Sequence, residues 1–163
     1  MTDIGTLGGL NSDAKGINNS GDVVGDSDDR AFLYSAGHMT DIGSLGGLGG
    51  SYAIGINSSG QVVGQASSVN GGYSAFLYFA GVMTDLNSLL PAGSNFHLDG
   101  AVAINDHGQI VGSGYYTGIN GSDTASFLLD INSASAPEPA SMVLLAVGVL
   151  PLILAARRRR ELK

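Results

Sequence analysis

The chain of 163 residues contains no cysteine, and only 13% of its residues are charged. The missing cysteines exclude a disulfide framework, a thiolate metal site and a cysteine nucleophile. Basic residues are especially scarce before the C-terminal tail, because residues 1–136 carry only Lys15 and Arg30 against 12 acidic residues. Nucleic acid binding requires a patch of basic side chains that displaces counterions, so this composition excludes nucleic acid as a partner.

A repeated hairpin pattern is present instead, at residues 16–25, 55–64 and 103–112. Each copy contains Ile-Asn-x-x-Gly and continues, one residue later, with two β-branched residues and a glycine. Asparagine can bond the backbone two residues further on, glycine adopts the positive φ that closes a turn, and β-branched residues favour strands. The pattern therefore predicts three β-hairpins.

Two further elements repeat together with this hairpin. They are an Ala-Phe-Leu-Tyr stretch at residues 31–34 and 75–78, which returns in weaker form at 126–129, and a Met-Thr-Asp stretch at residues 1–3, 39–41 and 83–85. Each unit therefore offers four short strands in about 40 residues. Phe32, Phe76 and Phe127 occupy equivalent strand positions, so we expect them in the core.

These elements predict an all-β fold of three repeated four-stranded antiparallel units, at about residues 1–38, 39–82 and 83–132. The spacing is that of β-propeller blades, although a β-solenoid or an irregular sandwich has similar spacing. Closed propellers usually have four or more blades, and the third unit lacks its own Met-Thr-Asp strand. Either residues 1–6 pair with the last unit and close a small ring, or the chain is the C-terminal part of a longer, incomplete array.

The N-terminus favours the second explanation. Met1 aligns with Met39 and Met83 inside the repeat, and no basic stretch followed by an apolar region precedes it. Exported proteins carry such a signal. We therefore expect the natural start of this protein to lie upstream of Met1.

The repeats resemble the HAF family of predicted extracellular repeat proteins. Its units run as "TDLGTLGG", then "A-x-x-I-N-x-x-G-Q-V-V-G", then "H-A-F-L-Y-x-x-G", and residues 3–9 and 41–47 keep the first stretch closely. The resemblance covers about 80% of the chain. The family histidine is replaced by Arg30, Ser74 and Ala125, so no role of that histidine is transferred to this chain.

The C-terminal tail predicts a single transmembrane helix. Residues 140–156 are seventeen uncharged residues, against the roughly 20 that cross a hydrocarbon core, and Pro151 weakens this helix. A linker at residues 133–139 precedes the helix, and a basic tail at 157–163 follows it. Arginine blocks stay cytoplasmic, so the repeats are expected on the far side of the membrane. The arginine block consists of Arg157, Arg158, Arg159 and Arg160.

The order of these tail elements is similar to a PEP-CTERM sorting domain. Pro137, Glu138 and Pro139 form the motif, and the apolar helix and the arginines follow it. The resemblance implies that an exosortase-type protease recognises the motif and removes the helix. The precursor would lie in the inner membrane with its repeats on the periplasmic side, and the mature protein in the cell envelope or outside the cell.

Ligand binding is expected on the connections between the second and third strands of each unit. These connections, at residues 26–30, 65–74 and 113–125, lie at the same end of the units and vary in length. They carry Tyr73, Tyr115 and Tyr116, whose rings can stack on sugars. The alternative is that these tyrosines cover small apolar clusters under long loops.

No pattern for a metal, a cofactor or catalysis is found. The acidic stretch at residues 26–29 could bind calcium, but it lacks the EF-hand glycine and distal glutamate and does not recur, so a solvated turn is favoured. His38, His97 and His107 are scattered, and no nucleophile elbow is present. The leading hypothesis is a non-enzymatic cell-surface or extracellular-matrix protein, and its rival is a module that binds exopolysaccharide.

Overall fold

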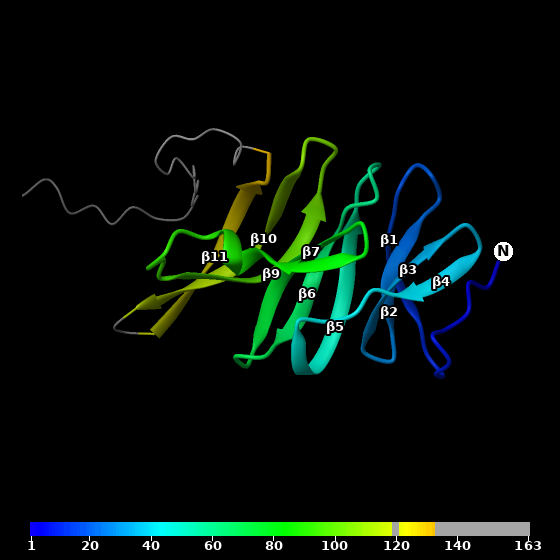
Figure 1. The fold of residues 1–163 in the computed structure, drawn as a ribbon, viewed down its shortest axis with the longest axis horizontal. Helices are drawn as coiled ribbons and strands as arrows, with labels where there is room; N and C mark the ends of the chain where they lie inside the picture. The colour runs from blue at the N-terminus through cyan, green and yellow to red at the C-terminus, as the bar shows by residue number, and fades with distance from the viewer. Residues whose placement is uncertain (119–120, 133–163) are drawn as a thin grey trace, which may run out of the picture.

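The computed structural model describes residues 1–118 and 121–132, which form three antiparallel β-sheets arranged side by side in a row (Figure 1). The first sheet holds β1 (Asp13–Ile17), β2 (Val23–Ser27), β3 (Arg30–Ser35) and β4 (His38–Asp41). The second holds β5 (Gly46–Ile56), β6 (Val62–Ser68), β7 (Tyr73–Phe79) and β8 (Val82–Asp85). The third holds β9 (Phe96–Ile104), β10 (Gln109–Gly118) and β11 (Gly121–Asp130), after a short 3-10 turn, η1 (Leu86–Leu89).

The predicted all-β class with repeated antiparallel units is confirmed. Consecutive strands are neighbours in every sheet, and the third sheet has three strands because the third Met-Thr-Asp stretch belongs to the second sheet. Each Met-Thr-Asp strand pairs with the Ala-Phe-Leu-Tyr strand before it, as in the pair Phe76 and Asp85. Each of the first two sheets therefore ends one strand later than the repeat unit predicted from the sequence, because it includes the Met-Thr-Asp strand that was assigned to the following unit.

The row of sheets is not a closed propeller (Figure 1). The idea that residues 1–6 pair with the last unit is wrong, because the N-terminal segment contacts the first sheet. The backbone N–H of Leu7 donates to the hydroxyl of Ser27, and the Arg30 guanidinium donates to the carbonyl oxygen of Leu7. The N-terminus and the third sheet lie at opposite ends of the row.

The Asn-x-x-Gly hairpin turns form as the sequence predicts. The side-chain oxygen of Asn18 accepts from the backbone N–H groups of Ser20 and Asp22, and Gly21 has a φ of 84°. The same bonds recur around Asn57 in the second sheet and Asn105 in the third. Because these bonds close within four residues, the local sequence determines the turns.

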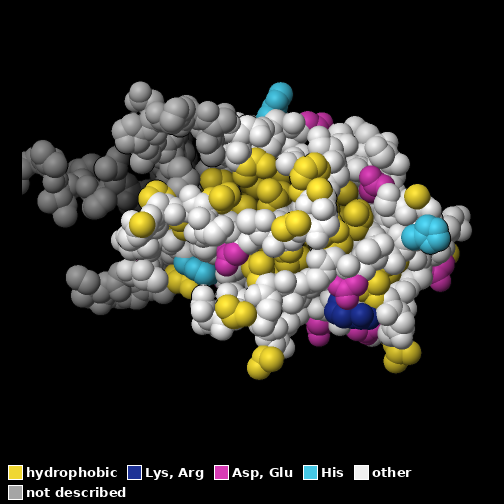
Figure 2. All heavy atoms as spheres, viewed as in Figure 1, with side chains coloured by type: hydrophobic (Ala, Val, Ile, Leu, Met, Phe, Trp, Pro, Cys, Tyr) yellow, Lys and Arg dark blue, Asp and Glu magenta, His cyan; other side chains and the backbone are white. Residues whose placement is uncertain are grey.

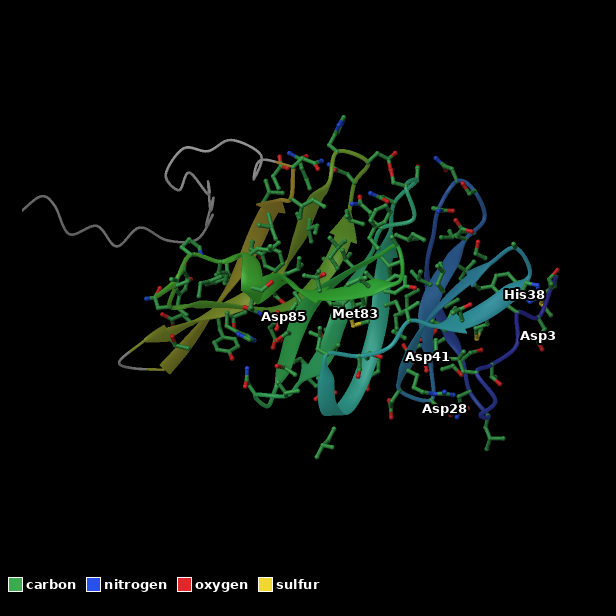
Figure 3. The ribbon with its side chains drawn as sticks, viewed as in Figure 1. Asp3, Asp28, His38, Asp41, Met83 and Asp85 are labelled. Atoms are coloured by element: carbon green, nitrogen blue, oxygen red, sulfur yellow. The ribbon has the colours of Figure 1, made fainter. Side chains whose placement is uncertain are left out.

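The Met-Thr-Asp stretches end in a second repeated turn. Asp3, Asp41 and Asp85, labelled in Figure 3, each accept a bond at 2.8 to 2.9 Å from the backbone N–H two residues further on. These carboxylates therefore have a structural role. Asp41 and Asp85 are the last residues of β4 and β8, and Asp3 holds the equivalent position in the N-terminal segment. Each turn directs the chain toward the sheet that follows.

The core lies between neighbouring sheets. The strand β5 packs across β1, β2 and β3 of the first sheet, and β9 packs in the same way across β5, β6 and β7. The apolar cluster between the first two sheets includes Val24, Val62 and Phe76. The cluster between the second and third sheets contains Val63 and Phe127.

Phe32 is also fully buried, as predicted, but it lies outside both clusters. It alternates along β3 with Ala31, which belongs to the cluster between the first two sheets. Side chains of neighbouring strand residues point to opposite faces, so Phe32 faces the outer side of the row.

The connections between second and third strands are shorter than the sequence suggests. β6 extends to Ser68 and β7 begins at Tyr73, while β10 and β11 leave only residues 119–120 between them. The ladder continues because backbone pairing does not depend on side-chain identity, and Tyr115 pairs with Thr124 inside it. The prediction that these residues form long loops is therefore wrong.

In the described part of the chain, no helix is long and apolar enough to cross a membrane. The predicted transmembrane helix at residues 140–156, the linker at 133–139 and the basic tail at 157–163 lie outside the described residues.

Candidate functional site

The candidate site is a row of aromatic side chains that crosses from the second sheet to the third. Tyr52 lies on β5, Tyr73 on β7, His97 on β9 and Tyr115 on β10. All four are half-buried. They lie toward the end of the sheets that carries the connections between second and third strands, the end at which the sequence predicts ligand binding.

Two ring pairs make up this aromatic row. The ring centroids of Tyr52 and Tyr73 lie 6.1 Å apart, and those of His97 and Tyr115 lie 4.9 Å apart. The imidazole Nε2 of His97 lies 2.8 Å from the backbone carbonyl oxygen of Tyr73 and thereby connects the two pairs. Donation to this carbonyl requires the His97 tautomer that carries its proton on Nε2.

An acidic side chain from the first sheet ends the row. The hydroxyl of Tyr52 donates to Oδ1 of Asp29 at 2.8 Å. This hydrogen bond, together with burial, raises the pKa of Tyr52 above its ordinary value, so the phenol remains protonated and acts as a donor. Asp29 occupies the two-residue turn between β2 and β3, where its φ is 63°.

Two glycines of β5 let the backbone pass close to the tyrosine hydroxyls. A Cβ atom at Gly50 would lie 2.8 Å from the Tyr52 hydroxyl, and one at Gly49 would lie 3.5 Å from the Tyr73 hydroxyl. A side chain at Gly50 would therefore crowd the Tyr52 hydroxyl, whereas one at Gly49 would meet the Tyr73 hydroxyl only at an ordinary contact distance.

The three tyrosines predicted from the sequence do not form one site. Tyr115 contributes to the aromatic row, but its neighbour Tyr116 contacts Phe96 at a centroid distance of 4.6 Å and packs against the core between the second and third sheets. Adjacent strand residues face opposite sides of a sheet. Tyr116 therefore packs against the core between the second and third sheets and is not part of the aromatic row.

Sequence reasoning did not identify Tyr52 as a member of the site. Tyr52 has no counterpart in the other repeats, and in the sequence it belongs to a first strand and not to one of the variable connections. The strand pairing could have identified it. Tyr52 on β5 pairs with Gln65 on β6, and β6 lies between β5 and β7, the strand that carries Tyr73.

The acidic stretch at residues 26–29 does not converge on a single point. Asp26 lies 3.3 Å from the ammonium of Lys15, and Asp28 accepts from the side-chain amide of Asn11. The third carboxylate, that of Asp29, accepts the hydrogen bond from the Tyr52 hydroxyl. Across residues 1–118 and 121–132, no three His, Asp or Glu side chains come together as a metal site.

Both basic side chains of the described residues are paired with carboxylates. Lys15 bonds Asp13 at 2.6 Å, and Arg30 lies 3.4 Å from Asp41. Figure 2 shows this pattern on one face, where the basic atoms lie among acidic ones and hydrophobic side chains gather in the middle. The aromatic row can therefore offer stacking surfaces, one imidazole and neutral hydroxyls to a ligand, without a concentration of positive charge.

The sorting motif Pro137, Glu138 and Pro139 and the arginine block at residues 157–160 lie outside the described residues. Comparison of the chain with models of protein families, with curated proteins and with solved structures finds no significant match.

Proposed function

We propose that this chain is a non-enzymatic repeat protein of the cell surface or extracellular matrix of a Gram-negative-type bacterium, delivered by exosortase-type processing at its C-terminus. The observation that carries the proposal is the order of the tail: a Pro-Glu-Pro motif at 137–139, an uncharged span at 140–156 and four arginines at 157–160. The precursor lies in the inner membrane with its repeats on the periplasmic side, and the mature form lies in the envelope or outside the cell.

The body of the chain supports this proposal. Its sheets are built from small and polar residues, it contains no cysteine, and its repeats resemble those of a predicted extracellular family. A protein of this kind contributes a stable acidic surface, and its repeats present extended faces to polymers or to other proteins.

Mass analysis of the C-terminus in envelope fractions tests the sorting step. The mature chain is expected to end near Pro139, and Glu138→Ala is expected to leave the full-length precursor in the membrane. Glu161→Ala, which changes the other glutamate of the tail, serves as the control and should be processed normally. An intact arginine block in the mature envelope form would show an ordinary tail anchor and contradict the proposal.

The second candidate function is binding of an exopolysaccharide by the aromatic row. It is favoured by the side chains of Tyr73, His97 and Tyr115, which lie on neighbouring sheets and are half-buried, so that part of each remains accessible. Stacking of sugar rings on aromatic faces, with hydrogen bonds from nearby hydroxyls, is a common mode of carbohydrate recognition.

Retention of the protein on polysaccharide purified from the same envelope tests this function. Tyr73→Ala and Tyr115→Ala should each weaken retention several-fold, and His38→Ala, at the opposite end of the first sheet, should leave it unchanged. Equal urea midpoints of the variants would exclude unfolding as the cause. Retention that is insensitive to both tyrosine substitutions would remove the aromatic row as the binding site.

A further inference from the structure

The end of the aromatic row nearest the first sheet brings a carboxylate and two tyrosine hydroxyls to one place. A Cβ atom at Gly50 would lie 2.8 Å from the Tyr52 hydroxyl and 2.9 Å from Cβ of Asp29, and one at Gly49 would lie 3.5 Å from the Tyr73 hydroxyl. The two glycines are consecutive residues of β5. The carboxylate and the two hydroxyls therefore gather around one short stretch of backbone, although they come from a turn of the first sheet and from two strands of the second.

The carboxylate of Asp29 is accessible and only partly used. Asp29 is exposed, and within residues 1–118 and 121–132 its Oδ1 atom accepts from the Tyr52 hydroxyl while its Oδ2 atom makes no hydrogen bond. The two basic side chains of the same residues, Lys15 and Arg30, pair with other carboxylates. The negative charge of Asp29 is therefore available to a ligand.

Two aromatic rings border this carboxylate. The rings of Tyr52 and Tyr73 are tilted by 49° to each other, and both side chains are half-buried. The face of a tyrosine ring attracts a cation through the quadrupole of its π system. A carboxylate beside two such rings suits an ammonium group, which can form an ion pair with the one and cation–π contacts with the others.

The middle of the row adds a hydrogen-bond acceptor. The Nε2 atom of His97 uses its proton for the carbonyl oxygen of Tyr73, so in the neutral ring Nδ1 is an acceptor. The surrounding surface is acidic as well, because residues 1–132 carry 12 acidic side chains against two basic ones. Such a surface attracts cations and repels anions. The ligand that fits the row therefore presents hydrogen-bond donors and positive charge.

We propose that the aromatic row binds a polymer of amino sugars with free amino groups, placing one ammonium group at Asp29, Tyr52 and Tyr73 and a sugar ring at His97 and Tyr115. The proposal rests on the second candidate function, polysaccharide binding by the row, and assigns the class of its ligand. A sugar polymer is favoured over a basic protein segment because the ring pairs continue from the second sheet to the third, and sugar rings stack on aromatic faces.

Titration calorimetry of the full-length chain in a mild detergent tests the ligand class with three oligosaccharides of equal length. Oligoglucosamine should bind about tenfold more tightly than its N-acetylated form, because acetylation removes the charge and keeps the sugar ring. Oligogalacturonate, which is anionic, should bind most weakly. Added salt should reduce the difference between the first two. Equal affinities for the free and the acetylated amine would overturn the proposal.

Asp29→Asn tests the position of the ammonium group. Asparagine keeps an oxygen that can accept from the Tyr52 hydroxyl, and it tolerates the φ of 63° at this turn position. The variant should lose most of the preference for the free amine and bind the acetylated form as the wild-type chain does.

Asp28→Asn is the matched control. Asp28, labelled in Figure 3, is the neighbouring turn residue, has a φ of 46° and bonds Asn11 instead of a tyrosine. This variant loses the same charge and should keep the preference for the free amine. A preference that survives in Asp29→Asn, or that falls equally in Asp28→Asn, would overturn the proposal.

The tyrosine variants separate this proposal from the function on which it rests. Tyr115→Ala should weaken the binding of oligoglucosamine and of its acetylated form by the same factor, because both lose a stacking surface. Binding that is insensitive to Tyr73→Ala and Tyr115→Ala would remove polysaccharide binding by the row altogether. Tyrosine-dependent binding without a preference for the free amine would overturn only the ligand class. Tighter binding of oligolysine than of oligoglucosamine, with the same dependence on Asp29, would assign the row to a basic protein segment instead.

Discussion

The side-chain amide of Asn57 donates to the backbone carbonyl oxygen of Asn105 at 3.0 Å and joins the second sheet to the third. The same side chain closes its own hairpin turn, because its oxygen accepts from the backbone N–H groups of Ser59 and Gln61. One residue of the repeat therefore determines both a local turn and the contact between neighbouring repeats.

Asn57→Ala is expected to lower the free energy of unfolding by about 1 to 3 kcal/mol, because it removes from a buried side chain two hydrogen bonds that close the turn and one that joins the second sheet to the third. Urea unfolding followed by circular dichroism measures this change. Asn105→Ala is the matched control, since Asn105 makes the same turn but is exposed and bonds no further sheet among the described residues. Equal losses for the two variants would contradict a role of Asn57 between the sheets.

Ser51 lies at the contact between the first two sheets, and its counterpart Ser12 lies before β1 at the end of the row, so the two serines allow a second comparison. Its hydroxyl accepts from the backbone N–H of Ala31 in the first sheet and donates to the carbonyl oxygen of Gly43. Ser51→Ala should therefore cost about 1 to 3 kcal/mol of stability, because the N–H of buried Ala31 loses its partner. Ser12 donates to Gly5 in the same way but is exposed, so Ser12→Ala should cost well under half as much.

Thermal unfolding of both serine variants at one protein concentration provides the measurement. A larger loss for Ser12→Ala than for Ser51→Ala would show that the contact between the first two sheets does not depend on this hydroxyl.

Gly64→Ala is expected to destabilise the second sheet by about 2 kcal/mol or more, because a Cβ atom there would overlap the carbonyl oxygen of Tyr52 on the paired strand. Gly60→Asn is the control. Gly60 has a φ of 76° and no atom near its Cβ position, and asparagine tolerates this backbone conformation. Chemical denaturation of the two variants should separate them clearly, and a neutral Gly64→Ala would disprove the close approach.

The Tyr52 hydroxyl predicts a pH dependence of stability. Its pKa in the folded chain is raised above the value of about 10 expected in the unfolded chain, so above that pH the folded state holds more protons than the unfolded state. The contribution of Tyr52 is therefore fully present below pH about 10 and is lost as the pH rises further.

Tyr52→Phe should be less stable than the wild-type chain at neutral pH, and its stability should fall less steeply between pH about 10 and 11.5. Urea unfolding at several pH values measures both slopes. Tyr34→Phe, on the first sheet, controls for the loss of one phenol. Parallel slopes for Tyr52→Phe and the wild-type chain would show that the bond to Asp29 does not hold the proton.

Much of the secondary structure could be predicted from the sequence, and the predictions succeeded where interactions are local. The turns at Asn18 and Asn57 close through bonds within four residues, and the recurrence of phenylalanine at equivalent strand positions correctly predicted that Phe76 lies in the core. The lengths of β10 and β11 could not be predicted, because backbone pairing continues through Tyr115 and Tyr116 whatever their side chains are.

The candidate site was predicted only in part for a related reason. Tyr73 and Tyr115 were selected because they lie near variable connections, but Tyr116 differs from Tyr115 only by one step of strand alternation. That step turns its ring toward Phe96 and the core. The contact of Tyr52 with Asp29 joins two different sheets and has no signature along the chain.

By itself, the sequence determined three repeats, their turn residues and the identity of the core phenylalanines, since these depend on contacts within one unit. Only the tertiary structure decided that the sheets form an open row, that the N-terminal segment contacts the first sheet, and that Val111 and Ile17 remain exposed at its two ends. The physical reason is that burial between units depends on which surfaces meet, and the repeat pattern is the same whether a neighbouring unit is present or absent.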